Sequence, residues 1–136
     1  MSLNAFLNPI KPENQKIVIS SRFVENDKPV EWELKAISAE QDEQLRKKCT
    51  IVKKAKNGIT EREFNNELYM SKLAAMCVVY PDLLNTELQD HYHVMNGEDL
   101  LKEMLTCGEY YKLLESVRMI NNFDEDFEEL VEQAKN

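Results

Sequence analysis

The sequence predicts an α+β fold that is predominantly helical, in which an N-terminal β-hairpin is followed by a cluster of five to six helices. Residues 16–37 are rich in β-branched residues and partly alternate between apolar and polar positions, as a half-buried strand does. From Ser38 onward, apolar residues recur at helical spacing instead. Only 3 Gly and 4 Pro occur among the 136 residues, which argues against a turn-rich β-sandwich.

Residues 1–15 are expected to form an N-terminal arm that precedes a single α+β domain, 16–136. Asn and Pro residues interrupt any regular element in this arm. Leu3, Phe6 and Leu7 nevertheless give it apolar side chains with which to dock. An arm that becomes ordered on a partner and an arm that packs on its own domain are equally consistent with this pattern.

The predicted hairpin spans residues 16–37. Its first strand covers 16–24, and a polar loop of hairpin length follows at 25–29. The second strand, 30–37, alternates cleanly, with Trp32 among the apolar side chains on one face. An isolated two-stranded hairpin is only marginally stable, so helices are expected to cover this apolar face.

The helical part, 38–136, is predicted to begin with a helix from Ser38 to about Lys54. Ser38 and Gln41 form a capping-box pattern at its start. Basic residues with no acid among them follow; they are Arg46, Lys47, Lys48, Lys53, Lys54 and Lys56. This cluster is typical of a solvated helix end that complements the helix dipole, and it is also consistent with a docking patch for an acidic partner.

Asn57-Gly58 is predicted to stop that helix, and a second capping-box pattern at Thr60–Glu63 to start a central helix over about 61–79, with Phe64 on its apolar stripe. Tyr80-Pro81 is expected to end the central helix, because a residue before proline disfavours the helical conformation. Three or four shorter helices are predicted after it, with candidates at about 86–93, 98–106, 109–120 and 124–134.

The formal charge is −8, but it is unevenly distributed along the chain. Residues 1–37 are balanced, residues 38–72 carry a net +2, and residues 73–136 carry a net −10. This distribution disfavours a protein that binds nucleic acid through a basic surface. No stretch approaches the roughly 20 apolar residues of a membrane span. We therefore expect neither nucleic acid nor a membrane as a partner.

No motif of catalysis, cofactor binding or metal binding is present, and we predict no residues with these roles. The glycines are too far apart for a phosphate-binding loop. His91 and His93 would point to different sides of a helix, and no HExxH spacing accompanies them. Cys49, Cys77 and Cys107 lack CxxC spacing, and no signal peptide precedes them. We expect them to pack as reduced thiols in a cytosolic protein.

The positive signal for function is a set of apolar and aromatic residues in the second half. Six Met and five Tyr make adaptable contact surfaces feasible. The connection Tyr80-Pro81-Asp82-Leu83-Leu84 joins two predicted helices, and further apolar residues follow over 92–105. A plain hydrophobic core explains this pattern, and so does a module that grips a partner helix in a groove.

At this point the sequence resembles the XkdN-like family of phage tail assembly chaperones. The segments that carry the resemblance span about 110 residues; they are Pro29-Val30-Glu31-Trp32-Glu33-Leu34-Lys35 with Ile37-Ser38, Val78-Val79-Tyr80-Pro81-Asp82-Leu83, Leu88-Gln89-Asp90, Leu100-Leu101 with Met104-Leu105, Gly108-Glu109-Tyr110 and Ala134-Lys135-Asn136. One departure is His91-Tyr92-His93, where the family pattern has Tyr-Gly and His93 occupies the glycine position.

The resemblance implies a non-enzymatic chaperone without a cofactor, which binds the tape-measure protein and keeps it soluble during tail morphogenesis. It also implies a location in the bacterial host cytoplasm and absence from the mature particle. We predict a protein-binding surface formed by Leu3, Phe6, Leu7, Tyr80, Pro81, Asp82, Leu83, Tyr92, Met95, Met104 and Tyr110. The oppositely charged parts of the chain favour, in addition, self-association of neighbouring copies.

Other functions remain open at this stage. One is a structural role, as a minor tail or head-completion protein that stays in the particle. Another is an acidic adaptor or DNA mimic, which the net −10 of residues 73–136 favours. A small hydrolase would need a pocket lined by paired acids and His91.

Overall fold

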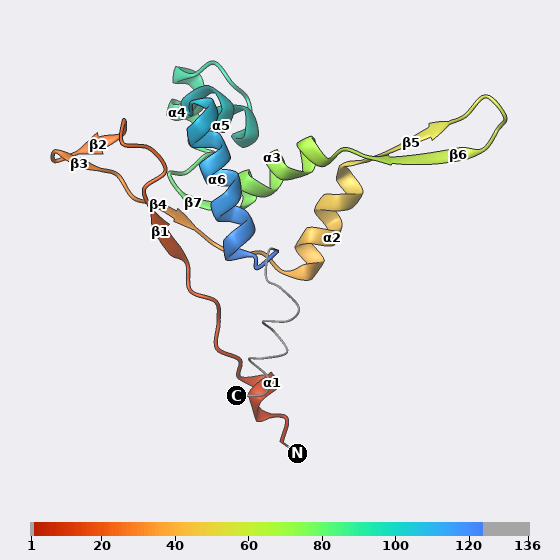
Figure 1. Cartoon of the computed structure of the whole chain (residues 1–136), viewed down its shortest axis with the longest axis horizontal. Helices are drawn as coiled ribbons and strands as arrows, with labels where there is room; N and C mark the ends of the chain where they lie inside the picture. The colour runs from red at the N-terminus through yellow and green to blue at the C-terminus, as the bar shows by residue number, and fades with distance from the viewer. Residues whose placement is uncertain (1, 124–136) are drawn as a thin grey trace.

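The computed structural model describes residues 2–123, which form a body of helices and a small sheet with three projecting segments (Figure 1). The projections are the N-terminal arm, the short hairpin of β2 (Val24–Glu25) and β3 (Lys28–Pro29), and a long hairpin of β5 (Thr50–Lys54) and β6 (Thr60–Phe64). The helix predicted over 124–134 lies outside the described residues.

Three antiparallel strands form the sheet of the body in the order β1-β4-β7. β1 (Gln15–Ile17) pairs with β4 (Trp32–Leu34), so the segment expected to form a hairpin folds back on itself. The paired strands are shorter than the predicted 16–24 and 30–37, because the β2–β3 hairpin occupies part of the residues between them. β7 (Val78–Tyr80) lies on the other side of β4, with Val78 opposite Leu34. The alternation in β4 places Trp32 and Leu34 in the core, where each is 1% exposed.

The prediction of a predominantly helical fold is wrong, because the described residues are 44% helix and 19% strand and form three separate sheets. The helix predicted to reach Lys54 ends at Lys48, and the central helix begins at Asn66 instead of residue 61. β5 and β6 occupy the intervening residues in a register of five pairs, from Thr50↔Phe64 to Lys54↔Thr60. β7 was not predicted either.

The physical reason for this error lies in the turn at Asn57-Gly58. Gly58 has φ +80, a left-handed conformation that glycine adopts without strain, and the turn closes a hairpin. The β-branched pair Ile51-Val52 favours a strand on one side of it. The capping-box pattern at 60–63 is therefore part of a strand, and Asn65 caps the following helix by accepting a hydrogen bond from Leu68 N at 3.0 Å.

The cap at Ser38 is formed as predicted. Its Oγ accepts a hydrogen bond from Gln41 N at 3.1 Å, and Gln41 Oε1 accepts one from Ser38 N at 2.9 Å. This capping box begins the first helix of the body. The helices are α1 (Asn4–Leu7) in the arm, and α2 (Ala39–Lys48), α3 (Asn66–Cys77), α4 (Thr86–His91), α5 (Gly97–Met104) and α6 (Cys107–Ile120) in the body.

The hydrophobic core lies where α3, α5 and α6 pack together against the sheet (Figure 1). Leu73, Leu101 and Leu113 contribute one fully buried side chain from each helix. Cys49 and Cys77 also pack in this core, but Cys107 is exposed. The packing role expected for all three cysteines is therefore wrong for Cys107.

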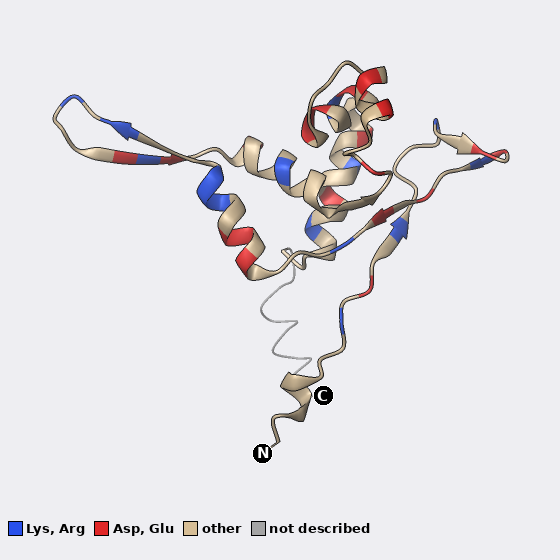
Figure 2. Cartoon of the chain, turned by 180° about the vertical axis from the view of Figure 1, so that it is seen from behind, with Lys and Arg blue, Asp and Glu red and all other residues tan. Residues whose placement is uncertain are grey.

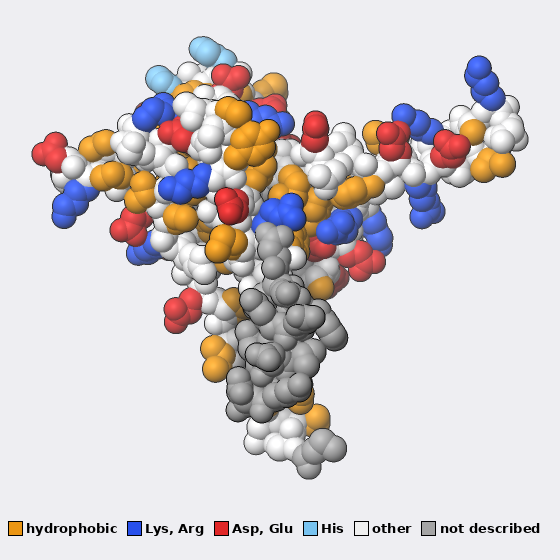
Figure 3. Space-filling model, viewed as in Figure 1, with side chains coloured by type: hydrophobic (Ala, Val, Ile, Leu, Met, Phe, Trp, Pro, Cys, Tyr) orange, Lys and Arg blue, Asp and Glu red, His pale blue; other side chains and the backbone are white. Residues whose placement is uncertain are grey.

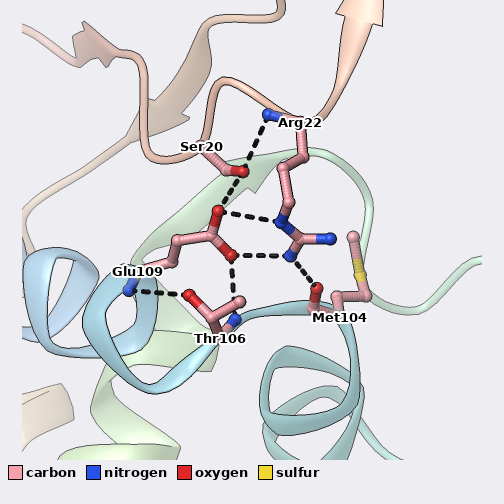
Figure 4. A network of polar contacts seen from close by, with 5 residues as sticks. All are labelled: Ser20, Arg22, Met104, Thr106 and Glu109. Atoms are coloured by element: carbon pink, nitrogen blue, oxygen red, sulfur yellow. Dashed lines mark hydrogen bonds and ion pairs between the residues drawn. The ribbon is translucent and has the colours of Figure 1, made fainter.

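A polar network joins the segment after β1 to the start of α6 (Figure 4). The Glu109 carboxylate accepts hydrogen bonds from Arg22 Nε at 3.0 Å, from Arg22 Nη2 at 2.6 Å and from Ser20 Oγ. It also accepts one from Thr106 N at 2.8 Å, while Arg22 Nη2 donates to the Met104 carbonyl at 2.8 Å. The hydrogen bonds from Arg22 and Ser20 hold the pKa of Glu109 well below its usual range.

Candidate protein-binding surfaces

The N-terminal arm presents its predicted contact residues to solvent. α1 is a single helical turn without a buried residue, and it lies well away from the helices of the body (Figure 1). Leu3, Phe6 and Leu7 are 70%, 82% and 69% exposed, and Ile10 is 97% exposed. A run of apolar side chains held apart from the core is characteristic of a surface that a partner covers.

The connection between β7 and α4 presents some of its predicted contact residues and buries one. Tyr80 and Leu84 are 51% and 77% exposed, whereas Leu83 packs in the core at 4%. Asp82 is exposed, and its Oδ1 accepts a hydrogen bond from Leu84 N at 3.1 Å, which fixes the turn. Pro81 is half-buried and follows Tyr80 through a cis peptide bond.

A hollow of about 410 Å³ opens between this connection and α4. The connection contributes Tyr80, Pro81 and Asp82 to its wall, and α4 contributes Glu87 and Leu88 among others. The hollow thus combines an aromatic ring, aliphatic carbons and the imidazole of His91 with two carboxylates. This composition suits a cationic side chain with an apolar neighbour.

The remaining predicted contact residues lie in different environments. Met95 is 93% exposed and is available for contact. Tyr92 and Tyr110 are half-buried and pack against the core, and burial raises the pKa of Tyr110. Met104 is 7% exposed and belongs to the core. Met104 and Leu83 are thus placed to support the fold and not to contact a partner through their side chains.

The predicted contact residues do not form one continuous patch. The arm extends from one side of the molecule, while the Tyr80–Leu84 connection lies in the body (Figure 1). Figure 3 shows apolar side chains on the visible face of the body, on the arm and on the β5–β6 hairpin. A partner that contacts all of them must be extended, or several partners must bind.

Sequence reasoning missed the β5–β6 hairpin as a candidate surface. Ile51, Val52 and Ile59 are 48%, 61% and 59% exposed on it, beside exposed lysines. The hairpin extends far from the body with both faces open to solvent (Figures 1 and 2). The signal was present as an Asn-Gly turn beside a β-branched pair, which is a strong short-range hairpin pattern.

The base of this hairpin is clamped to α2 and α3 by a cluster around Arg46. The Arg46 guanidinium lies 4.4 Å from the ring centre of Tyr69 and 5.6 Å from that of Phe64. Its Nε donates to Asp42 Oδ2 at 2.9 Å, and the Tyr69 hydroxyl donates to Asp42 Oδ1. Burial and the hydrogen bond to Asp42 raise the pKa of Tyr69 to about 12.

The predicted basic cluster is divided between two elements. Arg46 and Lys47 pair with Asp42 and Glu43 on α2, with Lys47 Nζ 3.6 Å from Glu43 Oε1. The lysines at 53, 54 and 56 lie on the hairpin instead of a helix end. The prediction that these basic residues form one helix end that complements the helix dipole is therefore wrong for Lys53, Lys54 and Lys56.

The histidines lie at the surface around the end of α4. His91 ends the helix and contacts the ring of Tyr92 edge-on at 4.9 Å, and His93 is exposed. Within residues 2–123, no three His, Cys, Asp or Glu side chains lie together in an arrangement that could hold a metal ion. Across the same residues, no helix is both long enough and apolar enough to span a membrane.

Comparison with known proteins gives a consistent family match. Residues 3–135 match the family model described as phage XkdN-like tail assembly chaperone protein. The chain is 30% identical over 129 residues to the phage-like element PBSX protein XkdN of Bacillus subtilis strain 168, covering 93% of this chain and 87% of that protein.

A second relative provides a structural comparison. YqbN of Bacillus subtilis strain 168, described as an uncharacterized protein, is 33% identical over 129 residues, again covering 93% of this chain and 87% of that protein. The crystal structure of YqbN superposes with a TM-score of 0.76 at 25% identity. The superposition covers 91% of this chain and 97% of the YqbN chain.

Proposed function

This chain belongs to the family of XkdN-like phage tail assembly chaperones, and from that premise we propose that it binds the tape-measure protein and keeps it soluble during tail morphogenesis. In this role it acts by stoichiometric binding in the host cytoplasm, without catalysis or a cofactor. It leaves before the tail is complete and is absent from the mature particle.

The observation that carries the proposal is the exposed apolar arm. Leu3, Phe6, Leu7 and Ile10 are between 69% and 97% exposed, and the arm lies well away from the core (Figure 1). Covering such side chains removes apolar surface from water and releases roughly 25 cal/mol per Å² before the costs of association. The arm therefore supplies a driving force for binding an apolar partner.

The separation of the apolar surfaces fits an extended partner. The arm and the Tyr80–Leu84 connection lie on different parts of the molecule (Figure 1). A long chain with repeated apolar stripes can engage both at once, and each further contact gains from the effective concentration set by the first. The excess of negative charge keeps the covered complex soluble.

Co-expression with the tape-measure protein encoded in the same operon tests the proposal. We expect a soluble complex that co-purifies with this chain. The triple variant Leu3→Ser, Phe6→Ser, Leu7→Ser should lose the complex while keeping the circular dichroism spectrum of the wild type. Val24→Ser, at a residue 55% exposed on β2, is the matched control and should retain it. An insoluble tape measure in the presence of the wild-type chain would refute the proposal.

Mass spectrometry of purified particles separates this role from a structural one. The chaperone role predicts that peptides of this chain are absent from mature particles but abundant in lysates during assembly. Peptides at the level of other minor tail proteins in the particle would instead establish a structural component.

A further inference from the structure

The β5–β6 hairpin carries unpaired positive charge and exposed apolar side chains. Lys53 pairs with Glu63 at 2.7 Å. In contrast, Lys54, Lys56 and Arg62 form no ion pair with any residue that the structure describes. Ile59 stands beside the two lysines at the tip and is 59% exposed. A two-stranded hairpin projecting alone is marginally stable, so contact along it would stabilise it.

The end of the body that carries α4 and α5 is acidic. Exposed carboxylates gather on and around α4 and α5, as the red segments of Figure 2 show; they belong to Asp82, Glu87, Asp90, Asp99 and Glu103. The hollow of about 410 Å³ lies at this end, with Asp82 and Glu87 on its wall beside Tyr80, Pro81 and Leu88. Within the described chain, Glu87 and Asp90 take part in no ion pair.

The two surfaces are complementary but lie on different parts of the same chain. The hairpin points away from α4 and α5 in both ribbon views (Figures 1 and 2). Its base is fixed by the cluster of Arg46, Tyr69 and Phe64, so it does not fold back over the body. A basic hairpin and an acidic hollow on one chain can therefore meet only between two copies.

We propose that the tip of the β5–β6 hairpin of one copy docks in the acidic hollow between the Tyr80–Leu84 connection and α4 of a second copy. Ile59 covers the apolar part of the hollow, formed by Tyr80, Pro81 and Leu88. Lys54 and Lys56 lie against Asp82 and Glu87. This contact does not depend on the identity of any other partner, so it is independent of the function proposed above.

The contact is heterologous, because it joins two different surfaces. Each copy that offers its hairpin to one neighbour still has its own hollow free for another. Such a contact either closes into a ring or continues as an open array.

Sedimentation velocity of the purified full-length chain tests the contact. At about 50 mM salt we expect the mean sedimentation coefficient to rise with protein concentration, and at about 1 M salt the rise should disappear, because the Debye length falls to about 3 Å. Lys54→Glu with Lys56→Glu should remain monomeric at low salt, and so should Glu87→Lys with Asp90→Lys. All four residues are exposed, so the fold should survive.

The decisive step is to mix the two double variants. In the mixture, the unchanged hairpin of one variant meets the unchanged hollow of the other, and the two reversed surfaces also complement each other. We expect association to return at low salt. The matched control, Lys11→Glu with Lys28→Glu, makes the same change in net charge away from both surfaces and should associate like the wild type.

Three outcomes would overturn the proposal. The first is a wild-type chain that stays monomeric at every concentration and salt. The second is a control variant that loses association as completely as the hairpin variant. The third is a mixture of the two double variants that remains monomeric.

Discussion

His93 adopts a backbone conformation that favours glycine. Its φ is 58, in the left-handed region, two residues after the end of α4. The turn forms nevertheless, with His93 N donating to the Asp90 carbonyl at 3.2 Å and Val94 N to the Gln89 carbonyl at 3.0 Å. A histidine therefore fills a position whose backbone conformation favours glycine.

Replacing this residue tests the strain. His93→Gly should raise the free energy of unfolding by about 0.5–1 kcal/mol, because glycine adopts the left-handed conformation without a Cβ penalty of about 1–2 kcal/mol and loses part of that gain to its freer unfolded chain. His91→Gly, in the helix two residues earlier, should lower it. Urea denaturation measures both. A destabilised His93→Gly variant would contradict the account.

Tyr69 gives a prediction at alkaline pH. Its pKa is about 12 in the folded chain against an ordinary 10.0, first because the ring is buried and second because the hydroxyl donates to Asp42. A raised tyrosine pKa contributes stability that is complete below pH 10 and is lost as the pH rises towards 12. Absorbance of tyrosinate should show a tyrosine with a midpoint near 12, and Asp42→Asn should lower that midpoint. A Tyr69 that titrates near 10 would contradict the hydrogen bond.

Glu109 gives the corresponding prediction at acid pH. The folded chain binds a proton at Glu109 more weakly than the unfolded chain does, because Arg22 and Ser20 donate to the carboxylate. Its contribution to stability is complete above the ordinary pKa of 4.5 and is lost as the pH falls below it. Glu109→Gln should thus be less stable than wild type at pH 7, by a margin that narrows below pH 4.5.

Thermal unfolding over a pH series measures that margin. Glu115→Gln, at an exposed position on the same helix, is the control and should match the wild type throughout. The loss of thermal stability in Glu109→Gln should therefore shrink towards pH 3. A loss that stays constant down to pH 3 would contradict a contribution from the charge of Glu109 to the network of Figure 4.

At the scale of elements, local sequence patterns predicted the correct helix or strand where the tertiary packing agreed with them. The Ser38–Gln41 pattern predicted the start of α2, and the alternation around Trp32 predicted the buried face of β4. Thr60–Glu63 has the same capping pattern but is paired with β5, because the Gly58 turn and a register of five pairs outweigh it. β7 depends on pairing with β4, a tertiary contact that no local pattern contains.

The β5–β6 hairpin should be removable without loss of the fold. Only Thr50 and Ala55 among its residues are even half-buried, so it contributes little to the core. Replacing residues 52–62 with an Asn-Gly turn should leave the thermal midpoint within a few degrees of wild type. Leu101→Ala, at a fully buried position, should instead cost about 2–5 kcal/mol. A hairpin deletion as destabilising as Leu101→Ala would show that the hairpin supports the core.

At the scale of the whole molecule, a packed body holds separate surfaces apart in space (Figure 1). The arm residues could be named from sequence as apolar side chains outside any element, and the structure places them in solvent. Leu83 and Met104 could not be assigned in this way, because an apolar residue in a short helical segment has the same pattern whether it faces the core or a partner. The surface of the β5–β6 hairpin could not be named from the sequence, because its residues were predicted to belong to two helices.

Hydrogen–deuterium exchange of this chain, alone and in complex with the co-expressed tape-measure protein, tests the central claim most directly. The claim is that the exposed arm and the connection between β7 and α4 bind that partner. The account predicts slower exchange at residues 3–10 and 80–84 in the complex, with α3 unchanged. Exchange that stays unchanged in both segments, or the absence of any complex to measure, would contradict it.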